Sequence, residues 1–91
     1  MRCENITCAC KALGDCTRIK IILFLKDEKR CVCEIYEKLK LPQNLVSHHL
    51  KILREAKLIT VKRSGKWMHY SLNATQLKKI TQAFNSLNST K

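Results

Sequence analysis

The sequence has little glycine, little proline and few acidic residues. Its 91 residues include two Gly and one Pro, so it lacks the turn-forming residues of a hairpin-rich all-β protein, and helices are favoured. Only seven Asp and Glu accompany 18 Lys and Arg, which gives a net charge of +11 at pH 7. A hydrophobic fraction of 45% is nevertheless too high for a disordered chain. We therefore expect residues 1–91 to form one small, basic, mainly helical domain.

A long apolar run is also missing. The longest stretch, residues 19–25, is interrupted by Lys20, whereas a helix that spans a bilayer needs about 20 apolar residues. The first eight residues contain no apolar signal core. We therefore expect no membrane association and a cytoplasmic location. Because a domain of this size buries only about 60–65% of its unfolded surface, a dimer or a bound metal is expected to support it.

Apolar spacing predicts two helices in residues 31–56, at 32–40 and 43–56, with a break at Leu41-Pro42. Two helices joined by a short turn form a helix-turn-helix, although the glycine that is usual in this turn is absent. Ahead of them, residues 1–10 are either a flexible arm or a short helix. Asp15 is suited to cap the next helix, whose apolar face is predicted to comprise Ile19, Ile22, Leu23 and Leu25.

After Lys57 the apolar period changes from helical to alternating. Residues 58–61 and 67–72 are predicted strands, joined by a loop with Ser64-Gly65 at its tip. A two-stranded β-wing at 58–72 directly after a helix-turn-helix is the layout of a winged helix. A last helix at 75–88 carries an apolar stripe, which either packs against its own core or contacts a second copy; its members are Leu77, Ile80, Phe84 and Leu87.

The charge is distributed unevenly along the chain. From Ala56 to Lys91 there are seven basic residues and no acidic one, and three of the seven lie in the hairpin loop. A run of charge is often only a solubilising surface. Beside a helix-turn-helix, however, it indicates double-stranded DNA, because basic groups release the counterions of a polyanion.

The outward positions of helix 43–56 carry polar side chains that can read base edges. Gln and Asn pair with adenine, while Ser and His donate to bases or phosphates. His49 either joins His48 in this role or packs against the core; adjacent side chains on a helix point about 100° apart, which argues against a shared zinc ion. The residues expected to contact DNA are Gln43, Asn44, Ser47, His48, Lys51, Lys62, Arg63 and Lys66.

All six cysteines lie within the first 33 residues, and Cys31 and Cys33 have Cys-x-Cys spacing at the start of a helix. Such clustering indicates metal binding or thiol redox chemistry rather than a disulfide scaffold. The helix N-terminus, Lys29 and Arg30 are expected to favour the thiolate form. On a regular helix, side chains two residues apart point about 200° apart. Either Cys31 therefore precedes the first turn, or metal binding unwinds that turn.

Two thiolates do not complete a soft-metal site. Thiolates select soft or borderline ions such as cadmium, lead, zinc or copper(I), and trivalent arsenic is satisfied by three of them. Further candidate ligands are Cys3, Cys8 and Cys10, while Cys16 is more typical of a small buried residue at a helix start. Thiol oxidation or persulfide formation is the alternative chemistry. No Cys-His-Asp arrangement is visible, so an enzyme is not expected.

Three segments and the predicted wing resemble the ArsR/SmtB family of metal-sensing repressors. The segments are residues 11–21, 31–34 and 46–59, and the last of them contains Ser-His-His-Leu and Leu-Arg-Glu-Ala. The resemblance spans about residues 11–73. It implies a homodimeric winged helix whose terminal helices form the interface. It also implies repression at an inverted-repeat DNA operator and release when a metal or metalloid binds.

The resemblance also implies a thiolate site. Cadmium and lead sensors of the family combine the Cys-x-Cys pair with cysteines of the N-terminal arm, which here are Cys3, Cys8 and Cys10. The zinc-sensing branch uses His and acidic ligands on the last helix, but residues 74–91 contain none. Arsenite sensors often add a third cysteine soon after the pair, where Tyr36 stands here. Cys16 replaces a usual proline. The expected effector is therefore cadmium, lead, zinc or arsenite.

Overall fold

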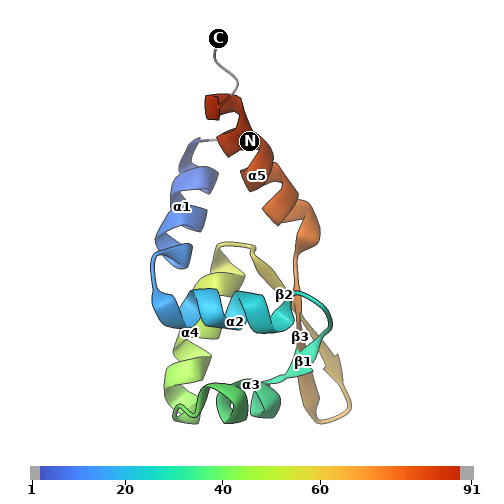
Figure 1. The fold of residues 1–91 in the computed structure, drawn as a ribbon. Helices are drawn as coiled ribbons and strands as arrows, with labels where there is room; N and C mark the ends of the chain where they lie inside the picture. The colour runs from blue at the N-terminus through green and yellow to red at the C-terminus, as the bar shows by residue number, and fades with distance from the viewer. Residues whose placement is uncertain (1–2, 89–91) are drawn as a thin grey trace.

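Eight elements make up the fold of residues 3–88, the part of the chain that the computed structural model describes, with side chains from Ile6 onward. In chain order they are α1 (Cys3–Leu13), α2 (Cys16–Leu25), β1 (Arg30–Cys31), α3 (Val32–Leu39), α4 (Gln43–Glu55), β2 (Ile59–Ser64), β3 (Trp67–Leu72) and α5 (Ala74–Asn88). The molecule is elongated, at 50 × 24 × 22 Å, and α1 and α5 extend from the body at the same end (Figure 1). No helix within residues 3–88 has the length and apolar character needed to cross a bilayer.

The hydrophobic core lies where α2, α3 and α4 meet one face of the sheet. Burying one large apolar side chain stabilises a fold by about 1.5–3 kcal/mol. The largest fully buried side chains are Ile21, Leu25, Ile35, Val46, Leu50, Leu53, Leu58 and Ile59. This core fixes the position of the helix-turn-helix relative to the sheet.

The apolar face predicted for α2 is only partly correct. Ile21 and Leu25 are buried, whereas Ile19 and Leu23 remain 38% and 58% exposed. Five of the last seven residues of α2 are Ile or Leu, so apolar periodicity does not single out a face. Asp15 caps this helix as predicted, because its carboxylate accepts the backbone N–H groups of Thr17 and Arg18.

The helix-turn-helix is formed by α3 and α4. In its turn, Lys40 adopts the backbone conformation for which glycine is the usual residue. Lys40 has φ 56° and ψ 45°, the left-handed conformation that glycine adopts most readily. The N–H of Leu41 donates to the Tyr36 carbonyl at 3.3 Å, which closes the end of α3. Pro42, with φ −59°, is the N-cap of α4, which begins at Gln43.

The wing is an antiparallel hairpin that carries an additional strand. β2 pairs with β3 from Ile59–Leu72 to Ser64–Trp67. Gly65 has φ 62° at the first position of the two-residue turn, as a type II′ turn requires. β1 was not predicted; it pairs with the other edge of β3, giving the order β1-β3-β2. The mainly α winged helix-turn-helix with a β-wing is confirmed, and its sheet has three strands.

The two terminal helices place apolar side chains in different environments. α1 packs on the body through Ala9 and Ala12, so the N-terminal segment is helical where a flexible arm was the alternative. In α5, Ile80 is buried, whereas Phe84 and Leu87 are 44% and 69% exposed. The predicted stripe of α5 therefore serves the core only in its first half.

Replacing Lys40 by glycine is expected to raise the free energy of unfolding by about 1 kcal/mol, because glycine adopts the left-handed conformation without steric cost. Urea unfolding monitored by circular dichroism measures the change. Lys38→Gly, inside α3, is the control and should lower the free energy of unfolding by about 1 kcal/mol. A Lys40→Gly protein no more stable than wild type would contradict the strained turn.

Candidate nucleic-acid interface and thiol site

α4 presents a polar face to solvent. Its buried side, which includes Val46, Leu50 and Leu53, packs on the core. All five positions predicted to read DNA from this helix are exposed, namely Gln43, Asn44, Ser47, His48 and Lys51. The structure therefore places the predicted base-reading residues together on one accessible surface.

The wing adds exposed cations at the far end of the hairpin. Lys62, Arg63 and Lys66 are all exposed, as predicted. Arg63 Nε donates to the Gly65 carbonyl at 3.2 Å and braces the turn. The ammonium of Lys66 lies 5.6 Å from the centroid of the Trp67 ring. These contacts hold two cations at the tip, where a phosphate backbone can approach them.

His49 lies on the core side of α4, so of the two alternatives for this residue it packs against the core and does not join His48 on the DNA-reading face. It is only 8% exposed, and its Nδ1 lies 3.2 Å from Arg18 Nη1. Arg18 Nε also donates to the Ala12 carbonyl at 2.6 Å. A single guanidinium therefore ties α1, α2 and α4 together. Sequence patterns do not predict these contacts, because Ala12 and His49 lie 6 and 31 residues away from Arg18.

Burial governs the protonation of this cluster. It holds the pKa of His49 below its ordinary value, and the positive charge of Arg18 acts in the same direction. Partial burial raises the pKa of Asp15, but hydrogen bonds from the Arg18 and Thr17 N–H groups outweigh it and the pKa is lowered. Neutral His49 therefore accommodates the guanidinium, whereas a protonated His49 would repel it.

Cys31 lies before the first turn of α3, one of the two arrangements that the Cys-x-Cys spacing left open. It is the last residue of β1 and the N-cap of α3, with φ −79° and ψ 160°. Its N–H donates to Glu34 Oε1 at 2.9 Å, half of a capping box. The Cys31 side chain lies close enough to Cys33 to raise the pKa of that thiol through a hydrogen bond. The extended conformation at Cys31 thus brings together two sulfurs that a regular helix would separate.

The expected ionisation of the thiols is not found at Cys33. Its pKa is raised, first by the hydrogen bond with Cys31 and then by partial burial. Arg30 is directed elsewhere: its guanidinium lies 4.3 Å from the Phe24 ring centroid, and its Nη1 lies 3.8 Å from Glu34 Oε2. Cys33 must therefore lose its proton before it binds a metal.

The other cysteines whose side chains the structure describes, Cys8, Cys10 and Cys16, do not join this pair within one chain. Cys8 and Cys10 are exposed on α1, away from α3 (Figure 1). Cys16 is exposed at the first residue of α2, so its expected burial was wrong. The side chain of Cys3 lies outside the described residues. Among the described side chains, no three Cys, His, Asp or Glu residues form a group that could hold a metal ion.

The chemistry of Cys31 and Cys33 nevertheless fits a soft ion. Both are free thiols, half-buried and in mutual contact, and sulfur donors favour cadmium, lead and zinc over magnesium or calcium. Two donors leave the coordination of such an ion incomplete. The pair can therefore supply half of a soft-metal site, and further ligands must approach it.

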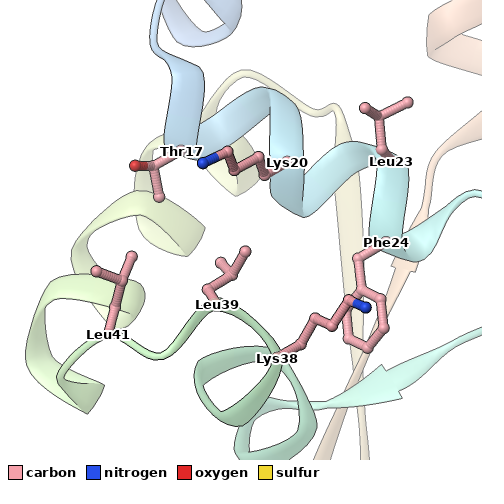
Figure 2. A pocket seen from close by; sticks show the side chains of 7 residues that line it. All are labelled: Thr17, Lys20, Leu23, Phe24, Lys38, Leu39 and Leu41. Carbon is pink, nitrogen blue, oxygen red and sulfur yellow. The ribbon is translucent and has the colours of Figure 1, made fainter.

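A separate cavity of about 510 Å³ lies between α2, α3 and the turn after α3 (Figure 2). Its lining is mainly apolar, with one hydroxyl and two ammonium groups. The lining residues are Thr17, Lys20, Leu23, Phe24, Lys38, Leu39 and Leu41. Because this lining contains no carboxylate, imidazole or thiol, the cavity is distinct from the thiol site and offers no ligand for a soft metal.

An exposed polar helix beside a basic hairpin defines a winged helix-turn-helix DNA-binding protein. The family model described as bacterial regulatory protein, arsR family, matches residues 15–61. An uncharacterized HTH-type transcriptional regulator of Methanocaldococcus jannaschii, MJ1325, is 37% identical over 78 residues, which cover 85% of this chain and 88% of that protein. The chain belongs to the arsR family. Members of this family are DNA-binding transcriptional regulators and not enzymes.

Two further comparisons agree with this assignment. The arsenical resistance operon repressor of Bacillus subtilis is 44% identical over 64 residues, which cover 69% of this chain and 61% of the repressor. An ArsR-like transcriptional regulator from Rhodococcus sp. RHA1 superimposes with a TM-score of 0.86 and 19% identity, over 94% of this chain and 81% of that structure. At that identity the superposition shows the fold alone.

The free energy of unfolding is expected to fall as the pH drops below about 6.5. The pKa of His49 is lower in the folded chain, so the unfolded chain takes up the proton first and protonation favours unfolding. His49→Gln should weaken this pH dependence. Urea unfolding at about pH 7.5 and about pH 5.5 measures it, with His48→Gln, an exposed imidazole on the same helix, as the control. Equal pH dependence in wild type and His49→Gln would contradict the argument.

Proposed function

We propose that the protein is a transcriptional repressor whose hold on operator DNA is relieved when a soft metal or metalloid binds the Cys31 and Cys33 thiols. The observation that carries this proposal is the contact between the two thiols at the first turn of α3. α3 is the first helix of the helix-turn-helix, and it packs directly against α4. A change at its start therefore bears on the helix that presents the DNA-reading face.

The proposed DNA complex uses two copies of the chain. α4 enters the major groove with its exposed polar face, and the wing cations contact the adjacent phosphates. Exposed Phe84 and Leu87 on α5 offer apolar surface to a second copy. A two-fold dimer reads two half-sites of opposite orientation, so the operator is an inverted repeat.

The proposed effector is cadmium, lead, zinc or arsenite. Cys31 and Cys33 supply two sulfur donors, and cysteines of α1 from the second copy are candidate further ligands, because those of the same chain lie away from α3. The name of the Bacillus subtilis relative connects that protein with arsenical resistance. Arsenite requires three thiolates, so its binding here would need at least one cysteine besides the pair.

Binding at the pair changes the local structure in a defined way. Both sulfurs would bind the ion as thiolates, and the hydrogen bond that raises the pKa of Cys33 would be lost. Two thiolates drawn toward one point then alter the N-cap of α3, where Cys31 also belongs to β1. Because β1 pairs with β3, this change reaches the wing as well as the helix-turn-helix. The two DNA-contacting elements would then no longer fit one operator together.

Oxidation of the same thiols is the second candidate, and the contact between the two sulfurs favours it. A thiol-redox repressor would release DNA after treatment with an oxidant in the absence of metal. The metal-responsive repressor would release DNA under reducing conditions when cadmium is added. The two functions are therefore separated by one binding assay performed under both conditions.

Cys33→Ser is expected to bind operator DNA normally and to lose metal-induced release, because one thiolate alone cannot hold the ion. Fluorescence anisotropy of a labelled operator duplex, with and without cadmium under reducing conditions, measures both properties. Cys16→Ser is the control: it removes an exposed thiol from the start of α2 and should retain release. If cadmium, lead and arsenite all leave wild-type DNA binding unchanged, the sensing function is refuted.

The double variant Lys62→Gln, Lys66→Gln is expected to bind all DNA sequences more weakly. Each lost phosphate contact should reduce the slope of log K against log salt concentration by about 0.9. Titrations at several salt concentrations measure the slope. The control, Lys78→Gln with Lys79→Gln, removes the same charge from the exposed face of α5. Equal slopes for the two double variants would show that the wing does not contact phosphates.

A further inference from the structure

β3 carries a histidine directly across from the thiol pair. The strand register places His69 opposite Cys31, and Tyr70 opposite Arg30. Residues opposite each other in an antiparallel pair project to the same face, and successive residues project to opposite faces. Tyr70 packs against the hydrophobic core. His69 and Cys31 therefore share the other face of the sheet, away from the core.

The Cys31–His69 pair is of the close, non-hydrogen-bonded kind. Ser64 and Trp67 close the two-residue turn and form a hydrogen-bonded pair, and hydrogen-bonded pairs alternate with non-hydrogen-bonded pairs along the hairpin. The second pair back from the turn, Lys62–His69, is therefore hydrogen-bonded. The backbone N–H and C=O of His69 thus face β2. The Cys31 N–H is correspondingly donated to Glu34 Oε1 at 2.9 Å. In pairs of this kind the Cα atoms are about 4.5 Å apart and the side chains approach closely.

Electrostatics also indicates that His69 belongs to this cluster. The pKa of Glu34 is held below its usual range first by the hydrogen bond from the Cys31 N–H, and in addition by the nearby Arg30 and His69. Glu34 lies in the same turn as Cys33. His69 is only partly buried, so its side chain has room to change rotamer.

We propose that His69 is the third protein ligand of the metal site at Cys31 and Cys33. This inference rests on the proposed function and adds a ligand from the wing. As the side chains stand, no three described donors are placed to hold an ion together, so the imidazole must rotate toward the sulfurs. Strand pairing already fixes the backbones at a suitable separation.

A donor set of two thiolates and one imidazole narrows the choice of metal. Zinc and cadmium accept mixed sulfur and nitrogen ligands, with a fourth position left for water or another side chain. Arsenite, which requires three thiolates, would not be satisfied by this set. The proposed site therefore favours a divalent ion over the metalloid.

Ligation by His69 would also connect the site to the DNA-contacting hairpin. On β3, the same residue pairs with Lys62 of β2, one of the proposed phosphate contacts. One bound ion would join β3 of the wing to the N-terminus of α3. The orientation of the wing relative to α4 would then depend on whether the site is filled.

The test compares zinc and cadmium affinities of wild type, His69→Ala, Cys33→Ser and His48→Ala, measured by competition with a chelating indicator under reducing conditions. Loss of an outer-shell partner typically costs about 10–100-fold in metal affinity, so loss of a direct ligand should cost at least about tenfold. His48→Ala removes an exposed imidazole elsewhere and should bind as wild type does. Cadmium-113 NMR of wild type should show coupling to the His69 imidazole.

The outcomes distinguish this inference from the function on which it rests. Weaker binding in His69→Ala, with His48→Ala unchanged, supports the ligand assignment. Unchanged affinity in His69→Ala, with weak binding in Cys33→Ser, overturns it and leaves the proposed sensor intact. A wild-type protein that binds neither ion overturns this inference, and it overturns the proposed function as well if lead and arsenite also fail to bind.

A variant that should gain affinity tests the same geometry without relying on the loss of metal binding. His69→Cys would place three thiols where the proposed ligands lie, so it should bind arsenite at least about tenfold more tightly than wild type. Thr60→Cys is the control. Thr60 lies on β2 and pairs with Ser71 of β3, so β3 separates it from Cys31 on β1. Equal arsenite affinity in wild type and His69→Cys would show that residue 69 does not reach the pair.

Discussion

Cys31 belongs to two elements at once, because it is the last residue of β1 and the N-cap of α3. The capping hydrogen bond to Glu34 and the pairing of β1 with β3 meet at this residue. The first helix of the helix-turn-helix is thereby attached to the wing through backbone contacts. Under the proposed function, a thiol at this junction acts on both elements proposed to contact DNA, whereas a thiol elsewhere on α3 would act on one.

The charge distribution complements this arrangement. Acidic groups lie in the first 55 residues, where Glu34 organises the start of α3 and Asp15 the start of α2. The exposed cations of the wing have no acidic neighbour in sequence to neutralise them. Arg18 binds the helices to one another by contacting both His49 and Ala12. The part of the chain that holds all the acidic residues therefore also contains the contacts that position α4, and the part without acidic residues contains the wing.

Local patterns in the sequence predicted most of the fold, and contacts between distant residues account for what they missed. Leu41-Pro42 marked the break between α3 and α4, and Ser64-Gly65 marked the hairpin, because both act within a few residues. β1 escaped prediction since two residues carry no period. The expected thiolate character of Cys33 failed because the hydrogen bond with Cys31 and then partial burial raise the pKa of Cys33. His69 gave no signal in the sequence, since only the register of β1 with β3 places it beside Cys31.

Under the proposed function, filling the thiol site weakens the binding of DNA. The decisive measurement is the operator dissociation constant of the wild-type protein, at fixed salt and under reducing conditions, with the site empty and then saturated with cadmium. Coupling between two sites typically amounts to about 5–150-fold in affinity, so binding at least about tenfold weaker is predicted for the saturated protein. The same dissociation constant in both states would contradict the account.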